Sequence, residues 1–123
     1  MLILPIKRKW LNMILDEIKQ EEYREMKPYW ATRFANYFGF ITADNKTDIE
    51  FMHEYIRANG QTKTKAIYFR NGYSKNAITY SIECALTIGT GKPEWGAEKD
   101  KEYYKLLIKS IPVDTRGFIK PYI

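Results

Sequence analysis

The sequence has little cysteine and little histidine, with one of each among 123 residues. A single cysteine, Cys84, excludes an internal disulfide and any cysteine-rich metal site. It lies within an apolar, strand-like run, which favours a buried, inert thiol over a nucleophile. The lone His53 gives little support to a histidine-based zinc site or a Ser-His-Asp triad, and we expect it at the surface or half-buried. We therefore predict no metal site and no cofactor.

Long apolar runs are also missing. None approaches the roughly 20 residues that a membrane-spanning helix needs. Residues 1–6 are apolar but too short for a secretory signal, and the basic residues 7–9 follow them rather than precede them. We therefore expect a cytoplasmic protein that does not enter a membrane. With 123 residues, 45% of them hydrophobic and 28% charged, the chain is expected to form a single domain over residues 1–123.

Positive charge and aromatic side chains are plentiful by contrast. Twenty lysines and arginines against 15 acidic residues give a net charge of +5, which leans weakly toward a polyanionic partner. Aromatic residues make up 15% of the chain and include 10 tyrosines. Tyrosine, tryptophan and arginine stack on unpaired bases, but a small, tightly packed β core needs aromatic residues too. Composition leaves both explanations open.

The most informative stretch is the charged segment at residues 19–28, which lies between two amphipathic segments. If it is a strand, its side chains alternate between two faces. Glu22 and Arg24 then share one face, and Glu21 and Tyr23 share the other. An acid and a base on one face either neutralise each other on a solvated edge strand, where such pairs contribute little, or line a cleft together.

Hydrophobic periodicity and turn residues predict the regular elements. Strands are expected at residues 2–6, 21–27, 65–70, 77–88 and 102–111, and helices at residues 7–19, at residues 29–38 with Pro28 in the first turn, and from the cap Asp48 to the terminator Asn59-Gly60. This order predicts an α+β domain with a mostly antiparallel, strongly bent sheet or small barrel, rather than a doubly wound parallel sheet.

Two loops carry candidate binding residues. Residues 70–76 form the predicted hairpin loop, in which Arg70 and Tyr73 suit a phosphate and base contact, although a merely solvated loop fits equally well. Residues 89–96 hold three glycines, a proline and a tryptophan, but they are not a phosphate-binding P-loop, because the glycine spacing is wrong and proline replaces the hydroxyl residue. Trp95 either plugs the end of the core or forms the wall of a pocket.

These residues resemble the ASCH domain family. The opening motif of that family is a strand, a basic turn with an aromatic residue, a helix, a lysine, and a charged strand that ends in arginine. The matching residues here are Pro5-Ile6-Lys7-Arg8-Lys9-Trp10, Ile14-Leu15, Lys19, Glu22, Tyr23 and Arg24. The loop at residues 91–96 before a Tyr-Tyr strand is similar to ASCH-like proteins of phages and prophages. The resemblance covers residues 3–28 and 86–108, and residues 39–64 are expected to be a family-specific insertion.

The resemblance implies a PUA-like β-barrel with flanking helices and a cleft walled by the first helix and the motif strand. Relatives include RNA-binding PUA domains and readers of modified bases, and some members are implied to hydrolyse N4-acylated cytidine or to act as ribonucleases. Lys19 matches the central catalytic lysine of the deacylating members, and Arg24 matches the arginine that ends the motif. Glu22 stands where those members have threonine, which weakens the case for the same chemistry, and Glu94 is the candidate for the acidic partner.

Three functional hypotheses follow. The first is a module that binds RNA, a nucleotide or a modified nucleoside through a cationic cleft. Its expected ligand-binding residues are Lys7, Lys9, Arg24, Arg70, Tyr73, Lys92, Trp95 and Tyr103. The second is a nucleoside-directed hydrolase or ribonuclease, in which Lys19 is the base or nucleophile and Glu22 or Glu94 moves the proton. The third is a protein-interaction module. The first two hypotheses both require Lys19, Glu22 and Arg24 to converge on a concavity.

Overall fold

The structure is a computed structural model of the chain, and it describes residues 1–73 and 76–111. Part of the predicted hairpin loop, residues 74–75, lies outside the described residues. The elements in chain order are β1 (Ile3–Ile6), α1 (Arg8–Leu15), β2 (Glu21–Glu25), α2 (Pro28–Tyr37), α3 (Ile49–Asn59), β3 (Lys65–Asn71), β4 (Thr79–Thr90), the short 3-10 helix η1 (Pro93–Trp95) and β5 (Glu102–Ser110). The predicted order of strands and helices is confirmed.

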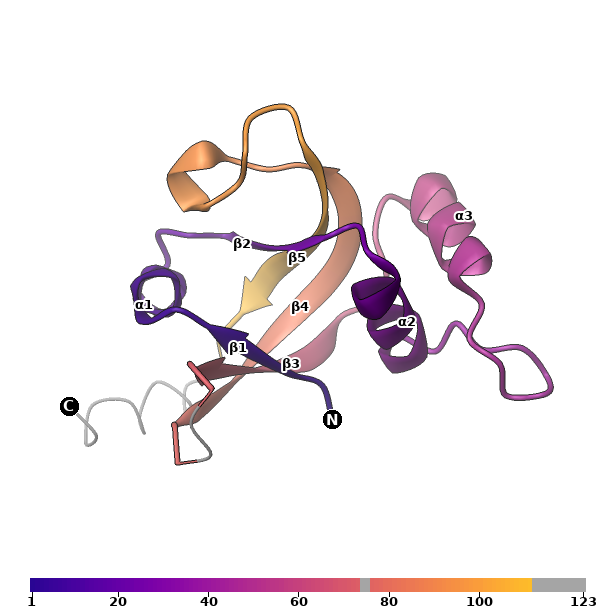
Figure 1. The fold of residues 1–123 in the computed structure, drawn as a ribbon, viewed down its shortest axis with the longest axis horizontal. Coiled ribbons are helices and arrows are strands. Elements are labelled where there is room, and N and C mark those ends of the chain that lie inside the picture. The colour runs from indigo at the N-terminus through magenta and orange to yellow at the C-terminus, as the bar shows by residue number, and fades with distance from the viewer. Residues whose placement is uncertain (74–75, 112–123) are drawn as a thin grey trace.

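The five strands form one mixed sheet in the order β1-β3-β4-β5-β2 (Figure 1). β1 runs parallel to β3, and the other three neighbouring pairs are antiparallel. The α+β class and the mostly antiparallel sheet are therefore as predicted. The ladder ends at β1 and β2, so the sheet is not closed into a barrel. Pro5 lies in the edge strand β1, where its missing N–H is tolerated.

The two edges of the sheet are brought together by the connection between them. Residues 7–20, with α1 as their regular element, carry the chain directly from β1 to β2, and Figure 1 shows α1 beside both strands. Figure 1 also shows that the long strand β4 curves, so that the sheet bends. Arg24 of β2 then joins the edges, because its Nη2 donates to the carbonyl oxygen of Pro5 in β1 at 2.7 Å. The edges lie close without pairing as strands, and the side chain of Arg24 bridges them.

The main core packs against this bent sheet. Buried side chains from all three helices and from β1, β3, β4 and β5 form it, including Phe34, Phe69 and Tyr104. A second, smaller cluster of Tyr23, Ala97 and Tyr103 joins β2 and β5 to the loop that follows β4. Because Tyr23 belongs to this second cluster, β2 and the loop that carries η1 are held against each other apart from the main core.

The first helix is shorter than predicted. The expected helix at residues 7–19 ends at Leu15, because Glu17 adopts a positive φ of 63° and the N–H groups of Ile18 and Lys19 both bond to one carbonyl of the preceding turn. Ile18, which had the spacing of an apolar stripe, is 57% exposed. Lys19 therefore lies on the link to β2 and not on the helix.

The other two helices begin as their sequences predict. Pro28 occupies the first turn of α2, where its missing N–H costs nothing. Asp48 caps α3 by accepting from the N–H of Phe51 at 2.9 Å. α3 lies within the segment expected to be an insertion, yet it buries Met52 and Ile56 in the main core. Within residues 1–73 and 76–111, no helix has the length and apolar character needed to cross a membrane.

Candidate functional site

A cavity of about 630 Å³ opens between the two edges of the sheet. All three tryptophans of the chain line it: Trp10 comes from α1, Trp30 from α2 and Trp95 from η1. Tyr29 and Tyr73 also contribute to its walls. We call this space the aromatic cavity. Rings from four separate segments suit it to a flat, π-rich ligand.

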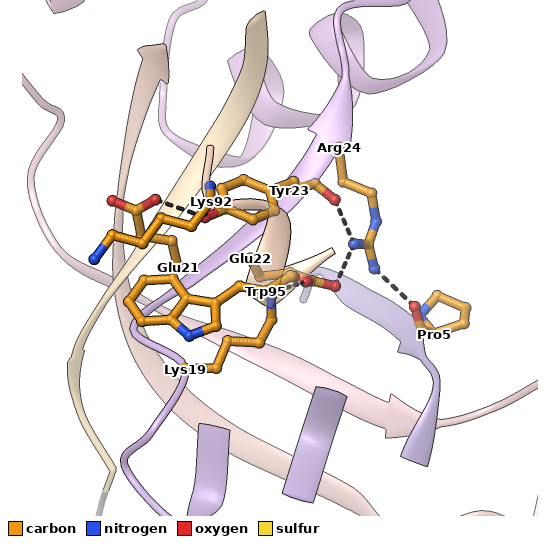
Figure 2. A network of polar contacts seen from close by, with 8 residues as sticks. All are labelled: Pro5, Lys19, Glu21, Glu22, Tyr23, Arg24, Lys92 and Trp95. Atoms are coloured by element: carbon orange, nitrogen blue, oxygen red, sulfur yellow. Dashed lines mark hydrogen bonds and ion pairs between the residues drawn. The ribbon is translucent and has the colours of Figure 1, made fainter. Parts of the chain in front are cut away.

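A carboxylate and a guanidinium form the polar end of the aromatic cavity (Figure 2). Glu22 is only 6% exposed, and its Oε2 lies 2.5 Å from Nη1 of Arg24. The same Nη1 donates to the carbonyl oxygen of Tyr23 at 2.8 Å, and Nη2 donates to that of Pro5. These bonds use three of the five N–H donors that a guanidinium carries. Within residues 1–73 and 76–111, no hydrogen bond from Nε or from the second N–H of Nη2 is found.

Lys19 lies behind this pair rather than in the aromatic cavity. It is 1% exposed, its Nζ lies 3.2 Å from Oε1 of Glu22, and it donates to the carbonyl oxygen of Trp95 at 2.5 Å. The rings of Trp10 and Tyr23 lie 5.1 Å and 4.6 Å from the same ammonium. The predicted convergence of Lys19 with Glu22 and the neighbouring arginine is thus found, but the lysine itself does not line the cavity.

The electrostatics of the site follow from this burial. Desolvation lowers the pKa of Lys19, the adjacent carboxylate of Glu22 opposes the shift, and the charge of Arg24 adds to it. Lys19 and Arg24 are positive and Glu22 is negative, so the three side chains together carry one net positive charge. Lys7 at the cavity wall adds another. Among the residues that the structure describes, no three His, Cys, Asp or Glu side chains are grouped as a metal site requires.

Trp95 is positioned by a loop that needs a glycine at its start. A Cβ on Gly91 would stand 2.5 Å from the ring of Tyr23, closer than real Cβ contacts come. The hydroxyl of Tyr23 accepts from the N–H of Lys92 at 3.0 Å and donates to Oε1 of Glu21 at 2.8 Å. Burial raises the pKa of Tyr23, so this hydroxyl keeps its proton and makes both bonds. The loop and Trp95 are thereby fixed to β2.

Four of the predicted ligand-binding residues lie at or beside the aromatic cavity, in addition to Trp95 and the arginine. Lys7 and Tyr73 line it, and Tyr73 is 87% exposed. Lys9 and Lys92 do not line it, but each ammonium lies 4.5 Å from the ring centroid of one of its tryptophans. Lys7 therefore lines the cavity, whereas Lys9 and Lys92 lie against two of its tryptophans.

Three other predicted site residues are not brought into the cavity. Arg70 stands opposite Pro5 in the β3–β1 ladder, and its buried Nε has no hydrogen-bond partner among the described residues. Tyr103 is buried in the second cluster, with its ring 5.5 Å from that of Tyr23. Glu94 is exposed on η1 and does not line the cavity. A role for Glu94 as the acidic partner remains a prediction.

Some lining residues were not identified from the sequence. Trp10 and Trp30 fit the apolar stripes of their helices, which is how core residues are recognised. Tyr29, next to Trp30, carried no signal of its own. A residue on the apolar face of a helix can pack against another side chain or face an open cavity. Which of the two occurs depends on the segment that packs opposite it in the fold. The one available clue was that Lys9 and Lys92 stand close in sequence to tryptophans.

Comparisons of this chain with protein-family models, with curated proteins and with solved structures find no match. The likeness of its motif residues to ASCH domains therefore has no support from overall similarity. The residues of the aromatic cavity have to carry the functional inference.

Proposed function

We propose that the chain binds a nucleotide or an unpaired base of RNA in the aromatic cavity. The observation that carries this proposal is the convergence of all three tryptophans on a cavity whose polar end is Glu22 and Arg24. Each base stacked on an aromatic ring contributes about 1–3 kcal/mol. A carboxylate accepts from the amino group of a base, and a guanidinium donates to its carbonyl oxygen or ring nitrogen. The pair therefore suits a base edge that presents a donor beside an acceptor.

The proposal extends to the family and the architecture. The aromatic cavity is walled by α1 and β2, which is where the ASCH resemblance puts a ligand cleft. We infer a PUA-like arrangement in which Arg24 bridges β1 and β2 in place of the hydrogen bonds that would close a barrel. A cytoplasmic location belongs to the same proposal, since nucleotides and RNA are present there.

Quenching of tryptophan fluorescence tests the proposal. We expect saturable quenching by at least one of AMP, CMP, GMP, UMP or N4-acetylcytidine. Tyr73→Ala is expected to weaken binding by about 5-fold or more through lost stacking. Its side chain is exposed, so its removal leaves the packing of the fold intact. Phe51→Ala, which removes an exposed aromatic ring from α3, is the matched control and should bind as the wild type does. Absence of saturable quenching by all five compounds would contradict the proposal.

Hydrolysis of an acylated cytidine is a second candidate function. The observation that favours it is Lys19, since burial lowers the pKa of its ammonium toward the range of a usable base. Against it, the carbonyl oxygen of Trp95 covers Nζ, so a substrate reaches Lys19 only if that loop moves. The test is chromatography of N4-acetylcytidine after incubation with the protein. Release of cytidine by the wild type but not by Lys19→Ala would support hydrolysis. Unchanged N4-acetylcytidine would reject it.

A further inference from the structure

A second, shallower hollow of about 250 Å³ shares Trp95 with the aromatic cavity. Glu21, Lys92 and Lys109 are among the other residues that line it. In Figure 2, Glu21 and Lys92 lie close to Trp95 at the left of the view, and Arg24 lies at the right. We call this second space the basic hollow. Trp95 therefore lines both spaces.

The one carboxylate of the basic hollow is already compensated. Oε2 of Glu21 lies 3.2 Å from Nζ of Lys105, and Oε1 accepts from the hydroxyl of Tyr23 at 2.8 Å. Both oxygens of Glu21 therefore have partners inside the protein. The carboxylate offers little repulsion to an anion that enters the hollow.

The positive charge of the basic hollow comes from Lys92 and Lys109. Nζ of Lys92 lies 4.5 Å from the ring centroid of Trp95, and Nζ of Lys109 donates to the neutral amide oxygen of Gln61 at 3.0 Å. Within residues 1–73 and 76–111, neither ammonium forms an ion pair with a carboxylate. Lysine binds phosphate as a point charge, so two such ammoniums are suited to a phosphodiester.

We propose that the basic hollow is a phosphate subsite for the nucleotide next to the base held in the aromatic cavity. The inference rests on the proposed function and makes its ligand a single-stranded polynucleotide rather than a free nucleoside. The base stacks in the aromatic cavity, and the sugar-phosphate backbone passes the edge of Trp95 to reach Lys92 and Lys109. Two linked contacts bind together more tightly than either does alone.

Binding of three related ligands tests this inference. The nucleoside that binds the wild type most tightly is compared with its 5′-monophosphate and with a hexanucleotide of the same base, made as RNA and as DNA. Each ligand is titrated over a range of salt concentrations. The variant is Lys92→Ala/Lys109→Ala. The matched control is Lys46→Ala/Lys63→Ala, which removes the same charge from exposed lysines that line neither space.

We expect both the wild type and the control to bind the hexanucleotide about tenfold more tightly than the nucleoside at low salt. The Lys92→Ala/Lys109→Ala variant should lose this advantage, so that it binds the hexanucleotide no more tightly than it binds the nucleoside. The slope of log K against log salt should fall by about 0.7 for each phosphate contact removed. RNA binding better than DNA would assign the strand as RNA, and equal binding would show that the backbone charge alone is recognised.

Two results would overturn the phosphate subsite while leaving the proposed function intact. One is a nucleoside that binds as tightly as the hexanucleotide. The other is an equal loss of hexanucleotide binding in the variant and in the control, which would show that only overall charge matters. If the wild type binds neither nucleoside nor hexanucleotide, the proposed function fails together with the subsite.

Discussion

At the scale of single residues, the unusual feature is a fully buried lysine. Lys19 sits at 1% exposure between Glu22, the carbonyl oxygen of Trp95 and two aromatic rings. A buried ammonium is tolerated when its charge and its donors are matched. Here it holds one oxygen of Glu22, so that the other oxygen is directed to Arg24 at the cavity. Lys19 is thus placed to position the carboxylate.

Lys19→Met should lower the free energy of unfolding by about 3 kcal/mol, because breaking a buried ion pair leaves a charge without its full compensation. The cost is at the lower end for such a change because Glu22 keeps its contact with Arg24. Lys27→Met is the control, since Lys27 pairs with Glu25 at the surface and such pairs contribute about 0–1 kcal/mol. Denaturant unfolding measures both. Equal, small effects would show that Lys19 has no structural role.

His53 should make stability depend on pH. Its Nε2 lies 2.8 Å from the hydroxyl of the buried Tyr104, and burial together with Arg57 lowers its pKa from the usual 6.5. The folded protein then holds the proton less well than the unfolded chain. The contribution of the neutral His53 to the free energy of unfolding is complete above pH 6.5, the pKa of the unfolded chain. It is lost as the pH falls through the lower pKa of the folded protein. Between about pH 5 and pH 7, the free energy of unfolding should rise more steeply with pH in the wild type than in His53→Gln. Denaturant unfolding at several pH values measures this. The same pH dependence in the wild type and in His53→Gln would refute this.

At the scale of elements, local signals predicted where helices begin but not where the first one ends. Pro28 and Asp48 mark the starts of α2 and α3 because their effect is local: proline fits a first turn, and an aspartate caps one. The end of α1 carries no glycine or proline, and Ile18 continues the apolar spacing. The positive φ of Glu17 results from the need to turn toward β2, which only the assembled sheet dictates.

Alanine should be tolerated at Gly89, near the end of β4, but not at Gly91 in the loop that follows. Gly91→Ala places a Cβ 2.5 Å from the ring of Tyr23, and such overpacking costs about 1–3 kcal/mol. Gly89→Ala meets only the flexible side chain of Lys105, at 3.6 Å or beyond, and should be neutral or stabilising by about 0.5 kcal/mol. Denaturant unfolding of the two variants gives the comparison. A Gly91→Ala protein as stable as the wild type would show that Tyr23 does not fix this loop.

At the scale of the whole molecule, the aromatic cavity exists because the two edge strands of the open sheet, β1 and β2, lie close together. The sequence predicted that Lys19, Glu22 and Arg24 would come together, since they lie within one short segment. It did not predict that Arg24 would reach Pro5, or that Trp30 would face the same cavity, because both depend on the bend of the sheet. Contacts between segments far apart in the sequence depend on the topology of the fold, and local sequence patterns do not predict them.

Arg24→Met should loosen both edges of the sheet. The change removes the bonds to Glu22 and to the carbonyl oxygens of Tyr23 and Pro5. Hydrogen bonds of charged groups contribute about 1.5–3 kcal/mol each, so amide hydrogen exchange in β1 and β2 should become about tenfold faster or more, with β4 much less affected. Arg33→Met, which removes a cation stacked on Tyr29, is the control and should leave exchange unchanged. Unaltered exchange in β1 and β2 of the Arg24 variant would show that the edges do not need this bridge.

Nuclear magnetic resonance of the indole N–H groups tests the central claim most directly, because each of the three tryptophans gives one such signal. The protein labelled with nitrogen-15 is titrated with the nucleotide that binds it best, and Trp30→Leu assigns one of the three signals. If the aromatic cavity holds the base, all three signals shift along one saturable curve while the amide of Phe51 on α3 stays in place. If the protein reaches saturation without movement of the three indole signals, or if they never move, the base does not bind between the tryptophans and the account is wrong.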